Sequence, residues 1–375
     1  MNDAPVTADL ALAPVTITPT KPLTPTHVKG LLWLDVIHKS TREIRPVTYV
    51  WNPRMSTLTA QTAAYWEFLD RAVGDVDWSA CSESELGELY VRSNAAGVRP
   101  TGDSLQPYFE RVEKEGWIHP ASVRLIDLWK EQLDLLNVAD PGLLDPAELT
   151  LTADDVLDVL REHQLTIDHR GIGGPVYLDG TIWGLPVRQI VDEEGVANYL
   201  VPVLRELIPI GARHQRVVLV YDQELMQDYI LLDKVLTALG AAVTRLALGR
   251  VPIDGVVASS RHGGWEGKTL SDLADACLRH VDVRTYRLGM RIYFIAMLER
   301  GCAKSFQPEL LRRSMVRAER ILGETGDAEP DSGGPAFLRR LAVPDGGYVD
   351  PYRLTTALLD RRRRVPADLL TTVFG

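Results

Sequence analysis

Four apolar segments that alternate with helical ones constrain most strongly how this chain can fold. They are rich in Val, Tyr, Leu and Thr and are bounded by turn residues, so we predict strands at 46–52, 174–184, 216–222 and 242–248. Helical spacing recurs at 29–40 and at 224–240, where Gly240 stands at a position typical of a helix C-terminus. Such strands alternating with helices predict an α/β fold, with a mostly parallel Rossmann-type sheet covered on both faces.

The composition is that of an ordinary globular protein. The chain has 375 residues, 45% hydrophobic and 25% charged, which suggests about two or three domains. Its net charge of −10 opposes nonspecific adhesion to nucleic acid, although a local basic face can exist. Three widely separated cysteines argue against a disulfide framework and a cysteine-based zinc site, and we predict no metal. Without a signal region or a long apolar run, we expect a cytoplasmic protein with no membrane segment.

The pattern of helices, strands and linkers predicts four regions along the chain. Helical periodicity dominates 85–170, and a polar, Gly/Pro-rich stretch occupies 323–335. We therefore expect a flexible tail over 1–15, a Rossmann-like domain over 16–254 with a helical insertion at about 85–170, a loop and helical domain over 255–325, and a linker with short C-terminal helices over 326–375.

Two loops are the places to look for chemistry, because ligands of open parallel sheets bind beyond the carboxyl ends of the strands. Segment 24–27, Thr-Pro-Thr-His, precedes a helix whose N-terminus suits an anion such as phosphate. Alternatively, Thr24 or Thr26 only caps that helix. Segment 255–278 places serines, a cation and glycines before another helix, as a phosphate-embracing loop would.

At these loops the sequence resembles the catalytic domain of class I aminoacyl-tRNA synthetases, arginyl-tRNA synthetase above all. Segment 16–27 matches the first signature of that family at Pro19, Thr20, Pro22, Leu23 and His27. Weaker likeness continues through segments 48–52, 174–186, 216–240 and 246–264. The resemblance covers roughly residues 16–325 and implies a site for ATP, an amino acid and the 3′ end of tRNA.

The departures from the family pattern change what the resemblance implies. Thr24 and Thr26 replace the first imidazole and the glycine of the signature, and a threonine there is expected to intrude on adenine. Val203 stands where the family has a carboxylate for arginine, four residues after the retained Tyr199, so we expect an apolar, leucine-like amino acid unless the alignment slips by one turn. Too few residues follow 325 for the family's anticodon-binding domain, so we expect a truncated paralogue.

The chemistry that remains favours aminoacyl transfer. Our leading hypothesis is a transferase that moves the aminoacyl group of aminoacyl-tRNA to a small-molecule amine in specialised metabolism, with no cofactor required. The alternatives are an amino acid ligase that uses ATP with Mg²⁺ and no tRNA, and a noncatalytic tRNA-binding paralogue. The oligomeric state stays open.

Particular residues are assigned to these roles. An Arg-rich stretch from Arg279 to Arg320 predicts a tRNA-binding face, or alternatively a solvated helix surface. Carboxylates at 222–228 are candidate bases or amine ligands, or simply acids favoured at a helix start. The predicted residues are catalytic His27, Thr24, Thr26 and Glu224; substrate-binding Tyr49, Asn52, Tyr199, Val203, Asp222, Gln227 and Asp228; phosphate- or 3′-end-binding Ser259, Ser260, Arg261 and His262; and tRNA-binding Arg312, Arg313 and Arg317.

Overall fold

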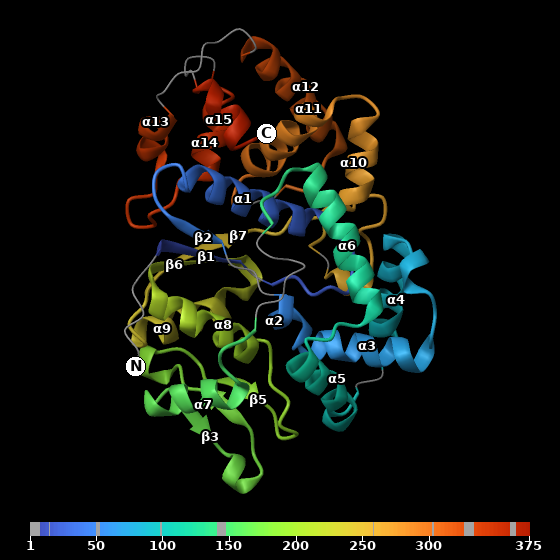
Figure 1. Cartoon of the computed structure of the whole chain (residues 1–375), viewed down its shortest axis with the longest axis vertical. Helices are drawn as coiled ribbons and strands as arrows, with labels where there is room; N and C mark the ends of the chain where they lie inside the picture. The colour runs from blue at the N-terminus through green and yellow to red at the C-terminus, as the bar shows by residue number, and fades with distance from the viewer. Residues whose placement is uncertain are drawn as a thin grey trace.

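Four parallel strands in the order β2-β1-β6-β7 form the central sheet of the protein. A computed structural model describes residues 8–14, 16–49, 53–97, 100–140, 148–257, 259–301, 304–325, 334–360 and 365–375 (Figure 1). The strands are β1 Ala8–Pro14, β2 Val47–Tyr49, β6 His214–Asp222 and β7 Ala242–Leu248. The prediction of an α/β fold with a parallel sheet is confirmed.

The strand β1 lies where we expected a flexible tail. It pairs with β2 on one edge and with β6 on the other, so it is a central strand. Leu10 and Leu12 face one apolar cluster and Ala11 and Ala13 face another, as the alternation along a strand requires. The tail predicted over 1–15 is therefore corrected at 8–14, because pairing on both edges orders a segment whose alanine-rich composition is not typical of a strand.

Helices cover both faces of this sheet (Figure 1). On one face lie α1 Pro25–Thr41, α11 Val283–Arg291, a π-helix at Ile292–Met297, α13 Gly334–Leu341, α14 Pro351–Ala357 and α15 Ala367–Thr372. On the other face lie α8 Leu200–Arg213 and α9 Met226–Ala238. Gly240 follows α9 with φ +93°, the left-handed conformation that was predicted for this position.

The helical insertion between β2 and β6 begins earlier than predicted. It comprises α2 Pro53–Thr57, α3 Ala60–Ala72, α4 Glu83–Ala95, α5 Gly102–Glu115, α6 Pro120–Leu135 and α7 Ala153–Glu162. Most of it packs around the buried Trp66 and Trp129 and against α10 Leu270–Leu278 and α12 Pro308–Thr325. The start near 85 is therefore corrected to residue 53, since α2 and α3 already belong to the insertion.

Segment 174–184, expected as a strand of the parallel sheet, belongs to a separate antiparallel one. β4 Val176–Leu178 pairs with β3 Thr166–Asp168 and with β5 Arg188–Val191. Its buried side chains Val176 and Leu178 pack beside α7 and α8. The strand prediction was right and its sheet was wrong, because local composition does not reveal a strand's partners.

A fully buried ion pair ties α1 to α11. Arg291 donates to Asp35 Oδ2 from Nη2 at 2.5 Å and from Nε at 3.2 Å. Arg291 also donates to the carbonyl oxygens of Leu136 and Asn137 after α6, and Lys39 Nζ lies 3.1 Å from Asp35 Oδ1. This network joins the end of α6 to α1 and α11. Removing Asp35 would leave the buried Arg291 without its counter-ion, and removing Arg291 would leave Asp35 with Lys39 as its counter-ion.

The C-terminal part packs on the sheet as the short helices α13, α14 and α15, within the region 326–375 where a linker and short helices were predicted. The linker predicted there falls mainly at 326–333, outside the described residues. No helix within the described ranges is both long and apolar enough to cross a membrane. The remaining single turns are η1 Trp78–Ala80, η2 Arg170–Ile172, η3 Thr181–Trp183, η4 Gln223–Leu225 and η5 Ser260–His262.

Candidate functional site

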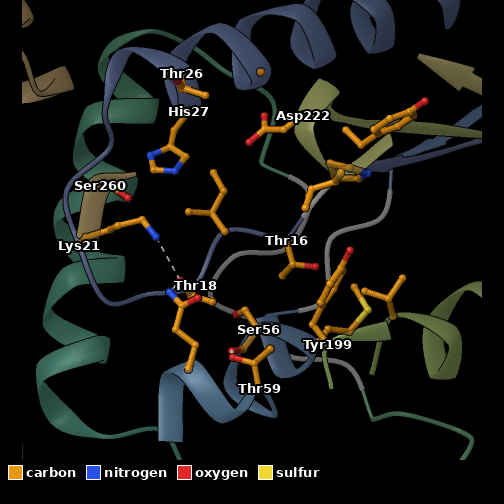
Figure 2. Close-up of a pocket in the computed structure, with 18 of the residues that line it drawn as sticks. Thr16, Thr18, Lys21, Thr26, His27, Ser56, Thr59, Tyr199, Asp222 and Ser260 are labelled. Carbon is orange, nitrogen blue, oxygen red and sulfur yellow. Dashed lines mark hydrogen bonds between the residues drawn. The ribbon is translucent and has the colours of Figure 1, made fainter. Parts of the chain in front are cut away.

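A cavity of about 480 Å³ lies at the carboxyl ends of the parallel strands. Its walls come from the segment after β1, the first turns of α1, the ends of β2, β6 and β7, the insertion helices α2 to α4, and the loop that contains η5. Figure 2 shows Lys21, His27 and Ser260 gathered on one side and Tyr199 on the other. Ligands of parallel α/β sheets bind at this edge, so the cavity is the candidate active site.

The threonines of the first loop are held by the fold itself. Thr24 is the N-cap of α1, in an extended conformation, and its Oγ1 lies 3.2 Å from His27 Nδ1. Thr26 Oγ1 accepts a hydrogen bond of 3.0 Å from the Val251 N–H in the loop after β7. Both threonines line the cavity; Thr24 occupies the N-cap position of α1, whereas Thr26 does not cap the helix but binds the loop after β7.

His27 presents a neutral imidazole to the cavity. Its Nδ1 accepts the Thr24 N–H at 3.1 Å, which leaves Nε2 as the protonated nitrogen of the neutral ring. Burial and the nearby cations Lys21 and Arg250 lower the pKa of His27 to about 3. His27 is therefore a hydrogen-bond donor through Nε2 without carrying a charge near neutral pH.

Lys21 is a site residue that our sequence interpretation missed. Its side chain lines the cavity and is only 8% exposed, with Nζ 3.4 Å from Thr18 Oγ1 and 5.2 Å from the centre of the Tyr90 ring. Burial, followed by the charges of Arg261 and Arg250, lowers the pKa of Lys21 to about 8. A lysine between two prolines in the loop after a central strand was the available signal, since such a loop faces the ligand site.

The second predicted loop lies beside the first, on the same side of the cavity as Lys21 and His27 (Figure 2). Ser259, Ser260 and Arg261 line it, and Arg261 Nε donates to Ser259 Oγ at 3.1 Å. The loop is held from behind, because Trp265 Nε1 donates to the Ser260 carbonyl at 3.1 Å. His262 is exposed and does not line the cavity.

Acidic groups beside the cavity are bound to one arginine. Arg250 Nε lies 3.2 Å from Asp222 Oδ2, and Arg250 Nη1 lies 2.7 Å from Glu224 Oε2. Asp222 lines the cavity, and burial raises the pKa of its carboxyl group. Glu224 is half-exposed and is not part of the lining, so its assignment as the catalytic base stays a prediction to which this geometry gives no support.

The opposite wall is largely apolar and aromatic. Val203, Met55, Leu225 and Tyr229 line it together with Tyr199. Tyr199 Oη donates to Asp228 Oδ2 at 2.7 Å, and Asp228 also binds Arg188. Of the other predicted substrate-binding residues, Tyr49 lines the cavity, Gln227 is exposed outside it, and Asn52 lies outside the described residues.

Further hydroxyl groups come from the insertion. Ser56 and Thr59 line the cavity beside Thr18, and sequence reasoning had not singled them out. Gln61 Nε2 bridges Thr18 Oγ1 at 3.2 Å and Tyr90 Oη at 2.9 Å. No motif marks these residues, because only the packing of α2 and α3 against the sheet edge brings them to the site.

The predicted tRNA-binding arginines share one exposed face of α12 and do not line the cavity. Arg312, Arg313 and Arg317 are all exposed. Glu309, one turn earlier, forms ion pairs with Arg312 at 2.8 Å and with Arg313 at 3.3 Å. This acid offsets part of the positive charge of the helix, and the role of the face stays a prediction.

Solved structures of arginyl-tRNA synthetases resemble this structure across nearly its whole length. The Thermus thermophilus enzyme aligns with a TM-score of 0.59 and 14% identity, over 99% of this chain and 74% of the enzyme. The Plasmodium falciparum enzyme aligns with a TM-score of 0.50 and 10% identity, over 98% and 68% respectively. Neither a protein-family model nor a curated protein sequence matches the chain. At such low identity the likeness shows the fold alone: this chain shares its fold with these arginyl-tRNA synthetases.

Proposed function

We propose that this protein transfers an aminoacyl group from aminoacyl-tRNA to the amine of a small molecule. The amine nitrogen attacks the ester carbonyl carbon, an amide forms, and the ribose oxygen of the tRNA leaves and takes up a proton. The ester is already activated, so the reaction needs no phosphoryl chemistry. The arginyl-tRNA synthetases that share the fold act, by their names, on tRNA, which supports tRNA as the partner.

The observation that carries this proposal is the state of the first loop. Thr24 occupies the N-cap position of α1, and Thr26 Oγ1 accepts the Val251 N–H. Both hydroxyl groups are uncharged, so neither side chain is a cationic donor toward a phosphate. His27 remains, and its neutral Nε2–H suits the oxyanion that develops when an amine attacks an ester. One such donor is typically worth about 10²- to 10³-fold in turnover.

The apolar wall supports an apolar aminoacyl group. Val203 and Tyr229 are both at most 9% exposed, and Met55 and Leu225 complete the surface. Among the described residues of this wall, the Tyr199–Asp228 contact is the feature that could bind a charged side chain. A leucine-like side chain would bury its methyl groups there, at about 0.8 kcal/mol for each buried CH₂ group.

The amine acceptor requires a group that removes its proton. Asp222 lies at the end of β6 and lines the cavity. Lys21, whose pKa is lowered to about 8, is partly deprotonated near neutral pH and lies on the side of His27. These two groups are the candidate bases within the cavity, in place of the solvent-facing Glu224.

One observation favours a second candidate, an ATP-dependent amino acid ligase. Lys21, Arg250 and Arg261 bring three cations to the side of the cavity that also holds Ser259 and Ser260. Such a group suits a polyphosphate. In this alternative the amino acid would form an adenylate with ATP and Mg²⁺ before passing to the amine.

The experiment that separates the two candidates tests aminoacyl-tRNA without ATP in one arm, and ATP with free amino acids but without tRNA in the other. The purified protein is incubated with a panel of aminoacyl-tRNAs, labelled on the amino acid, and an amine mixture, and deacylation of the tRNA is followed. In parallel, each of the twenty amino acids is tested for exchange of pyrophosphate into ATP. We expect deacylation for an apolar aminoacyl group and no exchange. Robust exchange of pyrophosphate into ATP with one amino acid, without deacylation of any aminoacyl-tRNA, would refute the transferase proposal and support the ligase.

A further inference from the structure

A carboxylate beside the apolar wall is already occupied by a guanidinium of the protein itself. Arg188, the first residue of β5, donates to both oxygens of Asp228, from Nε at 2.8 Å and from Nη2 at 3.2 Å. Asp228 Oδ2 also accepts the Tyr199 hydroxyl at 2.7 Å. The ring of Tyr199 lines the cavity, so this contact lies directly behind the cavity wall.

A carboxylate next to a tyrosine hydroxyl is a receptor for a guanidinium or ammonium group. Arginine binds such a carboxylate through two parallel hydrogen bonds, and the fork of Arg188 does so here. A substrate with a cationic side chain would have to displace Arg188, whose own positive charge would repel it. The Asp228 side chain is only 13% exposed, so little of its surface is open to a second cation.

We propose that Arg188 is a specificity-determining residue, which occupies Asp228 and so restricts the cavity to aminoacyl groups with uncharged, apolar side chains. This inference rests on the proposed aminoacyl site and adds the reason why cationic amino acids are excluded. Val203 and Tyr229 supply the apolar contacts, whereas Arg188 neutralises Asp228, the carboxylate that binds the Tyr199 hydroxyl.

Hydrogen bonds between β5 and the start of α8 explain how the Arg188–Asp228 pair forms. Asn198 Nδ2 donates to the Gln189 carbonyl at 2.6 Å, and the Asn198 N–H donates to the Ile190 carbonyl at 2.8 Å. These bonds hold β5 beside the start of α8, where Tyr199 is the N-cap. Arg188 therefore contacts Asp228, which lies in the first turn of α9. The described residues of β3, β4 and β5 do not line the cavity.

The test is a gain of binding for a cationic ligand. L-leucinamide and L-argininamide carry the amine and carbonyl of an aminoacyl ester, and their affinities for the full chain are measured by calorimetry. The wild type should bind leucinamide more tightly than argininamide. Arg188→Leu should raise the affinity for argininamide at least tenfold while leaving that for leucinamide within about threefold. Adding Asp228→Asn to that variant should abolish the gain.

Arg170→Leu is the matched control. Arg170, in η2 directly after β3, forms a similar two-pronged pair with Asp168 of that strand, has a similar exposure of 40% against 45% for Arg188, and does not line the cavity. It should change neither affinity. If Arg188→Leu does not fold, as judged by its melting curve, Arg188→Gln takes its place.

The outcomes separate this inference from the proposed function. If leucinamide binds but the Arg188 variants gain no affinity for argininamide, Arg188 does not set the specificity and the aminoacyl site stands. A wild type that prefers argininamide also overturns the inference. If neither amide binds to the wild type or to any variant, the aminoacyl site itself is refuted, and the specificity proposal with it.

Discussion

Replacing His27 by Asn separates the two contacts that its imidazole makes. The Oδ1 atom of Asn can take the place of Nδ1 as acceptor for the Thr24 N–H, but no donor then stands where Nε2 was. Replacing His27 by Ala removes both contacts. Thr24 is only 7% exposed, so its unpaired N–H in the Ala variant should cost about 1–3 kcal/mol in the free energy of unfolding.

Turnover should respond differently from stability. Both variants lose the Nε2 donor, so both should slow single-turnover deacylation of aminoacyl-tRNA by about 10²- to 10³-fold. Only the Ala variant should lose stability in urea denaturation. An Asn variant that keeps its rate to within a few-fold would refute the assignment of His27 as the oxyanion donor, and Lys21 would then be the next residue to test.

The pH dependence of stability tests the neutral state of His27. Its pKa is about 3 in the folded protein, whereas an imidazole in the unfolded chain has its ordinary pKa of 6.5, so between these pH values the unfolded chain binds a proton that the native state does not. The contribution of the neutral His27 to the free energy of unfolding is fully present above pH 6.5. It is lost as the pH falls, by at most about 1.4 kcal/mol per pH unit. His38 and His119 behave similarly, so the quantity to measure is the difference between wild type and His27→Asn. A difference that is constant from pH 7 to pH 5 would contradict a neutral, buried His27.

Three further predictions concern the surface and the core. Changing Arg312, Arg313 and Arg317 together to Glu should weaken tRNA binding and flatten its salt dependence, as measured by filter binding at several salt concentrations; an unchanged salt slope would remove α12 from the interface. Arg291→Leu leaves the buried Asp35 without its main partner and should lower the free energy of unfolding by about 3–5 kcal/mol in urea, and a loss below about 1 kcal/mol would contradict this. Burial raises the pKa of Glu83 to about 7, so the folded protein holds a proton there that the unfolded chain releases above about pH 4.5, and stability falls as the pH rises through this window. Glu83→Gln should therefore be more stable than wild type at pH 8 but not at pH 4, and equal differences at both pH values would refute the reasoning.

The sequence alone determined the features that depend on local pattern. The apolar runs at 216–222 and 242–248 are strong enough to identify β6 and β7, and Gly240 marks the end of the helix between them. Both site loops were also predictable, because a helix start after a strand and a Gly/Ser-rich stretch have recognisable compositions. The assignment of His27, Ser259, Ser260 and Arg261 to one cavity followed from these loops and from the family resemblance, and the structure brings all four together.

Only the tertiary structure decided which partners these segments meet. β1 is a strand because β2 and β6 pair with it on both edges, which its alanine-rich sequence does not reveal. Segment 174–184 belongs to an antiparallel sheet and not to the predicted parallel one. Pairing in that sheet positions β5, and therefore Arg188, next to Asp228. Side chains such as Lys21 acquire their chemistry from burial and neighbouring charges, and these depend on contacts between residues far apart in the chain. Periodicity and motifs report the local backbone, whereas such contacts form only when the whole chain has packed.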